Sequence, residues 1–136
     1  MIEEDRLVGL IQDARMVFIA GNGGSASTAE HMTNDLFSKG IAVICLNSNV
    51  SIMTMIGNDY GYEYIYSMQL DVYGTPEDLL ITISCSGTSP NVVNAQKVAR
   101  EIGMAVHAFE TFTTDRDYEG LEDRHLQLAH RVKKRL

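Results

Sequence analysis

The chain has 136 residues, 45% of them hydrophobic, and a formal net charge of −7. This length and composition predict one globular domain with a buried core. The acidic balance argues against a broad nucleic-acid surface, because phosphate backbones attract faces rich in Lys and Arg. A small anionic ligand stays compatible with this charge, because one helix N-terminus can bind it locally.

The cysteines and the apolar runs bear on the cellular compartment. Cys45 and Cys85 lie in or beside apolar runs and form neither a CxxC pair nor a disulfide framework, so we expect reduced thiols in a cytoplasmic protein. No apolar run approaches the length that crosses a bilayer, and the start MIEEDR lacks the basic residues of a signal peptide. We therefore expect no membrane association.

The first half of the chain is predicted to begin with a helix, because Leu7, Leu10 and Ile11 recur at helical spacing. The run IAVICL has no polar alternation, which is typical of a parallel strand covered on both faces. The predicted elements are, in order, helix 3–14, strand 16–20, helix 27–38, strand 41–46, helix 48–55, turn 57–61 and helix 62–72.

The second half repeats this arrangement. Its predicted elements are strand 78–83, helix 90–102, strand 104–109 and helix 121–136, with an ambiguous polar segment at 110–120. A strand, a loop of small residues and a helix thus occur at 16–38 and again at 78–102. This alternation predicts an α/β protein, a doubly wound three-layer α/β/α sandwich of the flavodoxin type with a mostly parallel sheet. Ligands of such folds bind at the carboxyl ends of the strands.

Two loops fall at those ends. The first, residues 21–25 (GNGGS), lets the backbone turn sharply and points amide groups at a ligand, although a tight turn without a ligand explains it equally well. It lacks the third glycine of GxGxxG and the lysine of a Walker loop, so no nucleotide cofactor is expected. The second loop, residues 84–89 (SCSGTS), offers hydroxyl groups that can hold a phosphate without lysine. Such a loop is weak evidence alone and stronger when paired with the first.

Polar residues on two predicted helices are candidates for chemistry. His31 and Asp35 lie four apart and share a face, which suits metal binding or a base beside its partner, but also a solvated polar face. Glu122 and His130 lie eight apart and can share a face or point to water. His107, inside an apolar strand, is interpreted as structural. The tyrosines at 60, 62, 64 and 66 are interpreted as packing or interface residues.

Three segments together resemble the sugar isomerase (SIS) domain, and within it the phosphoheptose (sedoheptulose-7-phosphate) isomerase family. Residues 21–31 match the pattern GNGGSAxxAxH, and residues 57–61 (GNDYG) and 83–104 (ISCSGTSPNVVNAQKVAREIGM) are also close. The closing helix, with Glu122 and His130, fits the family's spacing of a Gln and a His. The resemblance implies one SIS domain over residues 1–136, shortened at its N-terminal helix and in its C-terminal region.

The resemblance also implies an activity. The family reaction interconverts a ketose 7-phosphate and an aldose 7-phosphate through an enediol by acid–base catalysis. By the family pattern, Asp35 is the base and His130 its partner. The resemblance implies an active-site Zn²⁺ bound by His31, Asp35, Glu122 and His130. The implied substrate-binding residues are Asn22, Gly23, Gly24, Ser25, Asp35, Asn58, Asp59, Ser84, Cys85, Ser86, Ser89 and Glu122.

Two positions depart from the family pattern: Asp35 stands where the family has Glu, and Glu122 where it has Gln. Since family members assemble through helices and place their sites at subunit interfaces, a homo-oligomer, dimer or tetramer, is expected. The alternative is a non-catalytic SIS module that binds a phosphosugar or a protein partner. The retained His130 favours the isomerase, because the protein-binding, replication-initiator-associating relatives lack this histidine.

Overall fold

A computed structural model describes residues 2–112 and 114–136, and its centre is a four-stranded parallel sheet. The strand order is β2-β1-β3-β4. The strands are β1 (Val17–Gly21), β2 (Val43–Cys45), β3 (Leu79–Ile83) and β4 (Ala105–Ala108). Within the described residues none of the helices is both long and apolar enough to cross a membrane.

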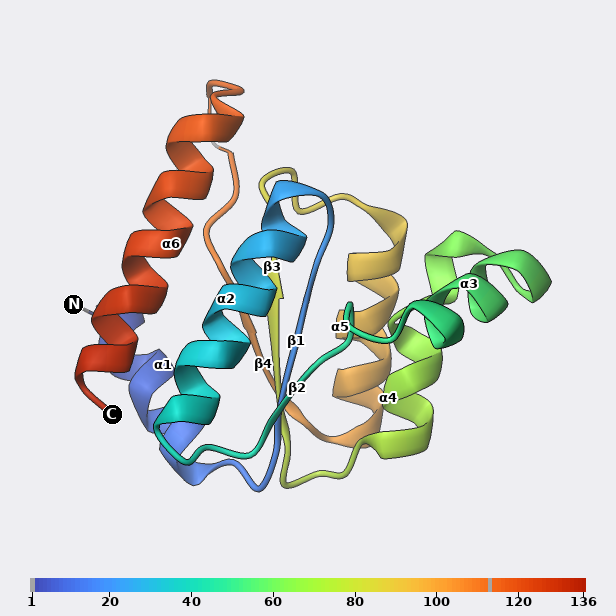
Figure 1. Ribbon diagram of the computed structural model, residues 1–136, viewed down its shortest axis with the longest axis horizontal. Coiled ribbons are helices and arrows are strands. Elements are labelled where there is room, and N and C mark those ends of the chain that lie inside the picture. Colours follow the sequence, from blue (N-terminus) through green and yellow to red (C-terminus); the bar gives the residue numbers. More distant parts are fainter. Residues whose placement is uncertain (1, 113) are drawn as a thin grey trace.

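Helices cover both faces of the sheet (Figure 1). The helical segments are α1 (Ile2–Asp13), α2 (Gly24–Ser38), α3 (Val50–Asp59), the short 3₁₀ helix η1 (Tyr62–Tyr64), α4 (Ser67–Tyr73), α5 (Pro90–Ile102) and α6 (Tyr118–Lys134). One layer contains α1, α2 and α6, and the other contains α3, α4 and α5. The predicted three-layer α/β/α class is therefore confirmed.

The core divides into two clusters because side chains alternate along each strand. In β1, Val17 and Ile19 pack with Leu7 and Met32 on one face. Phe18 and Ala20 pack on the other face, in the cluster that includes residues of α4 and α5. All five residues of β1, a central strand, are buried. The run IAVICL is predicted to be covered on both faces, but it forms the edge strand β2, where Val43 and Ile44 are only partly buried.

Several predicted boundaries differ from the structure. Helix α6 begins at Tyr118, three residues before its predicted start, because Asp117 is its N-cap. Helix α2 begins at Gly24, three residues early, because Gly23 turns the chain directly into the helix with φ 58°. The predicted turn at 57–61 is wrong in its first part, since residues 57–59 complete α3. The predicted helix 62–72 divides into η1 and α4, with Gly61 (φ 129°) preceding η1.

The register of the sheet brings the two candidate loops together. Gly21 at the end of β1 lies opposite Ile83 at the end of β3 in the parallel pairing. Because both strands end at the same edge, residues 21–25 and 84–89 leave the sheet side by side. This edge is where the doubly wound topology places ligands.

Gly21 is sterically required at this edge. A Cβ at position 21 would lie 2.7 Å from both Ile83 O and Ser25 O, which are backbone atoms that cannot rotate away. We expect Gly21→Ala to lower the free energy of unfolding by about 2 kcal/mol or more, measured by urea denaturation. The matched control is Gly9→Ala in α1, where a Cβ meets no heavy atom within 4 Å. That control should be neutral or stabilising by up to about 1 kcal/mol. Equal stability of the two variants would contradict the steric requirement.

Two buried histidines outside the loops are held neutral. In β4, His107 Nδ1 lies 2.7 Å from Arg6 Nη1 and Nε2 lies 3.3 Å from Glu3 Oε1. Because arginine only donates, Nδ1 is the acceptor and the proton is on Nε2. His125 in α6 donates from Nε2 to the Glu110 carbonyl at 2.7 Å, while its buried Nδ1 has no partner among the described residues. Burial lowers the pKa of both imidazoles below their usual value.

These shifts predict a pH dependence of stability. Since the pKa of each histidine is lower when folded, the unfolded chain binds more protons as pH falls below about 6.5. The free energy of unfolding should therefore fall between pH 7.5 and pH 5.5, with a slope of up to about 1.4 kcal/mol per pH unit for each histidine. Urea titrations at intervals across this range measure it. A free energy of unfolding that stays constant would contradict the assignment of neutral buried imidazoles.

Candidate active site

A polar cavity of about 260 Å³ lies between the two loops, where the N-terminus of α2 faces the β3–α5 loop. Its walls are Asn22, Gly23, Gly24, Ser25, Ser84, Cys85, Ser86, Ser89, Tyr118 and Glu122. Except for Tyr118, every one of these is a residue that the sequence predicts as substrate-binding. Folding thus gathers predicted substrate-binding residues from three separate segments into one cavity.

Hydrogen bonds within the second loop prepare its hydroxyl groups for an anion. Ser84 Oγ accepts from the backbone N–H of Gly87 at 3.0 Å, and Ser86 Oγ accepts from that of Thr88 at 3.2 Å. Each serine is therefore fixed as an acceptor while its own proton remains available for a ligand oxygen. Ser89 precedes α5 as the N-cap and makes no side-chain cap hydrogen bond. These hydroxyls and the start of α5 suit a phosphate group.

The two cysteine thiols are not activated as nucleophiles. Both cysteines are unpaired and buried, as the sequence predicts for reduced thiols. Burial is the main cause that raises the pKa of Cys85 in the cavity wall and of Cys45 at the end of β2. The neutral Cys85 thiol can therefore serve as a weak donor to a ligand but not as a thiolate nucleophile.

Three of the four predicted metal ligands lie together. His31 and Asp35 come from α2 and His130 from α6, and one ligand atom of each lies within 4.8 Å of the others. His31 Nε2 is 3.4 Å from Asp35 Oδ2 and 3.1 Å from His130 Nε2. The two imidazoles are exposed, but Asp35 is only 3% exposed.

The Asp35 carboxylate has one paired and one available oxygen. Lys133 Nζ lies 3.3 Å from Oδ1, whereas the buried Oδ2 has no hydrogen-bond partner among the described residues. A buried oxygen of this kind calls for a proton, a cation or a donor on a ligand. Two imidazole nitrogens and a carboxylate oxygen also form a donor set that Zn²⁺ accepts. The cluster therefore fits both a general base and a metal site.

Glu122 is not part of this cluster. Eight residues of α-helix separate it from His130 by about 12 Å along the axis. Its carboxylate instead packs against Gly24 at the start of α2, so closely that a Cβ at position 24 would collide with it. The positive end of the α2 dipole favours a carboxylate there. Glu122 thus belongs to the phosphate-sized cavity, where it adds negative charge.

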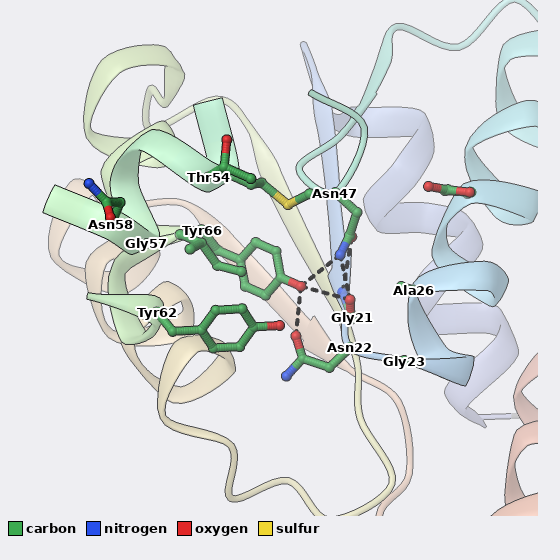
Figure 2. A pocket seen from close by; sticks show the side chains of 13 residues that line it. Gly21, Asn22, Gly23, Ala26, Asn47, Thr54, Gly57, Asn58, Tyr62 and Tyr66 are labelled. Atoms are coloured by element: carbon green, nitrogen blue, oxygen red, sulfur yellow. Dashed lines mark hydrogen bonds between the residues drawn. The ribbon is translucent and has the colours of Figure 1, made fainter. Parts of the chain in front are cut away.

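A second, larger cavity of about 640 Å³ opens on the other side of Asn22 (Figure 2). Its lining includes Asn22, Gly23, Asn47, Thr54, Asn58, Tyr62 and Tyr66. Of the two predicted polyol-binding residues, Asn58 lines this cavity, whereas the exposed Asp59 does not and accepts from Asn58 Nδ2 at 2.9 Å. Asn22 and Gly23 line both cavities, so they separate the phosphate-sized space from the larger one.

Sequence reasoning missed Asn47 and Tyr66, which are buried at the wall of this larger cavity. The Asn47 amide pairs with the peptide group of Gly21, accepting from its N–H at 3.3 Å and donating to its carbonyl oxygen. Tyr66 donates its hydroxyl to the same loop. The only signal in the sequence was the place of Asn47 directly after a strand, at the edge where ligands bind.

A doubly wound parallel sheet with two small-residue loops at its carboxyl edge defines an α/β protein with a candidate anion-binding site there. A family model for the SIS domain matches residues 4–111. The chain belongs to the SIS domain family.

Its relatives include phosphoheptose isomerases. The one from Trichlorobacter lovleyi is 42% identical over 105 residues, which are 73% of this chain and 54% of that relative. The one from Helicobacter pylori strain P12 is 40% identical over 104 residues, 72% of this chain and 54% of the relative. The solved structure of the phosphoheptose isomerase GmhA from Neisseria gonorrhoeae matches with a TM-score of 0.89 at 27% identity, covering 98% of this chain and 82% of that one. The chain spans about half the length of the curated relatives that it matches.

Proposed function

We propose that the protein is a phosphosugar aldose–ketose isomerase that interconverts sedoheptulose 7-phosphate and a heptose 7-phosphate through an enediol. One observation carries this proposal. The helix whose N-terminus forms the phosphate-sized cavity also carries Asp35, a buried carboxylate that clusters with the imidazoles of His31 and His130. The relatives named phosphoheptose isomerase supply the substrate class.

Different residues bind the phosphate, transfer the proton and contact the polyol portion of the sugar. The serine hydroxyls of the β3–α5 loop and the N-termini of α2 and α5 bind the phosphate. Asp35 removes a proton from one carbon of the sugar and returns it to the adjacent carbon, with His130 as its acid–base partner. When no metal ion is bound, Oδ2 of Asp35 is the atom that accepts the proton, since Oδ1 is paired with Lys133 and Oδ2 has no hydrogen-bond partner among the described residues. Asn58 and Asp59 are proposed to contact the polyol portion.

We further propose that His31, Asp35 and His130 hold Zn²⁺, the cofactor implied by the family. When bound, the ion would polarise the oxygens of the reacting carbons as a Lewis acid. Glu122 lies too far from His31, Asp35 and His130 in one chain to bind the same ion. Its proposed role is therefore at the phosphate-sized cavity, which it lines.

We propose a cytoplasmic homo-oligomer, dimer or tetramer. Large apolar side chains are exposed on the described surface, among them Phe37 at 73%, Val50 at 68% and Val72 at 79%. Burial of such side chains between subunits is favourable. Sedimentation equilibrium measures the assembly, and a monomer at all concentrations would contradict it.

Turnover tests the proposed activity directly. The protein is incubated with sedoheptulose 7-phosphate, with and without added Zn²⁺, and the aldose product is quantified by chromatography. We expect product in at least one of the two conditions. Tight binding of the phosphosugar without any product would overturn the isomerase and leave a binding module.

A further inference from the structure

The side chain of Asn22, in the wall between the two cavities, is held by hydrogen bonds on two sides. Its amide and that of Asn91 form a reciprocal pair: Asn22 Nδ2 donates to Asn91 Oδ1 at 2.8 Å, and Asn91 Nδ2 donates to Asn22 Oδ1 at 3.0 Å. From the other side, the Tyr66 hydroxyl lies 2.7 Å from Asn22 Oδ1 (Figure 2). Asn91 is 2% and Tyr66 1% exposed, so neither partner can exchange easily with water.

The protons of this network can be assigned. The Tyr66 hydroxyl has two possible acceptors, Gly21 O and Asn22 Oδ1, each at 2.7 Å. Asn47 Nδ2 already donates to Gly21 O, and its second proton points to the Tyr66 oxygen at 2.6 Å. Asn22 Oδ1 likewise accepts one hydrogen bond, from Asn91, so the single Tyr66 proton is shared between Gly21 O and Asn22 Oδ1. Burial raises the pKa of Tyr66, so that proton is retained at neutral pH.

This assignment leaves Asn22 with one free group. Both lone pairs of its Oδ1 are occupied, by Tyr66 and Asn91, and one of its two Nδ2 protons is bonded to Asn91. Among the described residues the other Nδ2 proton has no acceptor. Figure 2 shows the Asn22 nitrogen on the side away from Tyr66. The position can thus offer a ligand one N–H donor and no acceptor.

We propose that Tyr66, together with Asn91, is a positioning residue that locks the Asn22 amide as a single fixed N–H donor for an oxygen of the bound phosphosugar. The proposal rests on the proposed function for the identity of the ligand. A donor held rigid before the ligand binds needs no reorganisation during the reaction. The ligand atom that meets Asn22 must be an acceptor, such as a carbonyl, an alkoxide or a phosphate oxygen.

Tyr66→Phe tests the lock because it removes the hydroxyl and keeps the ring. The control is Tyr73→Phe: this ring stacks on Phe18 at 6.3 Å, and its hydroxyl has no hydrogen bond among the described residues. The first measurement is solvent exchange of the Asn22 side-chain amide protons by NMR, with the signals identified by their loss in Asn22→Ala. We expect exchange about tenfold or more faster in Tyr66→Phe and unchanged in Tyr73→Phe.

The second measurement is a double-mutant cycle on turnover of sedoheptulose 7-phosphate. Tyr66→Phe should lower kcat/KM about tenfold, as the loss of one hydrogen bond predicts. It should have little further effect in an Asn22→Ala background, because Tyr66 acts through Asn22. A full additional loss in that background would overturn the proposal and leave Tyr66 a purely structural residue.

The two readouts separate this inference from the proposed function. Unchanged amide exchange in Tyr66→Phe overturns the lock, whatever the turnover. A wild-type protein without turnover overturns the isomerase, while faster exchange in Tyr66→Phe alone would still support the lock.

Discussion

Replacing Asp35 by Asn is expected to lower kcat about a thousandfold, within the range measured for loss of a general acid–base group. The amide has nearly the shape of the carboxylate but cannot accept the proton from the sugar carbon. The structure makes Asp35 the best candidate base because it is 3% exposed and keeps Oδ2 free of hydrogen bonds among the described residues. Initial rates with sedoheptulose 7-phosphate measure the effect, with the fold checked by circular dichroism.

The matched control is Asp123→Asn on the exposed part of α6. It carries out the same chemical change away from the cluster and should leave kcat unchanged. If Asp35→Asn retained more than about a tenth of the wild-type rate in a folded protein, another group would be the base. That result would also show that Asp35 does not replace the Glu that the family pattern has at this position.

Replacing His130 by Ala is expected to lower kcat at least about a hundredfold. His130 Nε2 lies 3.1 Å from His31 Nε2, within the cluster that surrounds the Asp35 carboxylate. The side chain is exposed, so its removal should change the free energy of unfolding by only about 0.5 kcal/mol. A loss of turnover can therefore be separated from a loss of fold, with kcat from initial rates and stability from urea titration.

The control on the same helix is Lys134→Ala, another exposed residue one turn further on. It should leave kcat within about twofold of the wild type. An unchanged kcat in His130→Ala would exclude this histidine from the mechanism. It would also remove the feature that distinguishes the chain from a non-catalytic SIS module.

Most of the fold follows from local patterns. Apolar β-branched runs predict the four strands within one or two residues at each end, and glycines mark the ends of α2 and α5. Two of the errors lie where glycine allows more than one path. At Gly23 the chain enters α2 without an intervening turn, and at Gly57 the helix α3 continues through a residue that reads as a turn. Tertiary contacts with neighbouring side chains and the sheet decide the backbone path at these glycines, and these contacts cannot be read from a single sequence.

The candidate site could be predicted only in part, because spacing within one helix is visible in the sequence but contacts between distant segments are not. Spacing of four places His31 beside Asp35 from the sequence alone, and the structure brings His130 to them from α6. Spacing of eight also suggests that Glu122 joins them, but the axial rise carries it to the other cavity. The role of Tyr66 was beyond prediction, because its partners Gly21 and Asn22 are 45 and 44 positions away and meet it only in the folded chain.

Proton abstraction from the sugar is the central step of the account, and hydrogen exchange measures it most directly. Sedoheptulose 7-phosphate is incubated with the protein in D₂O, and the C1 hydrogens are followed by NMR together with the appearance of the aldose. We expect deuterium to enter the sugar or the aldose to form, at a rate that falls about a thousandfold in Asp35→Asn. A wild-type protein that binds the phosphosugar but neither exchanges its C1 hydrogens nor forms the aldose, with or without Zn²⁺, would contradict the account.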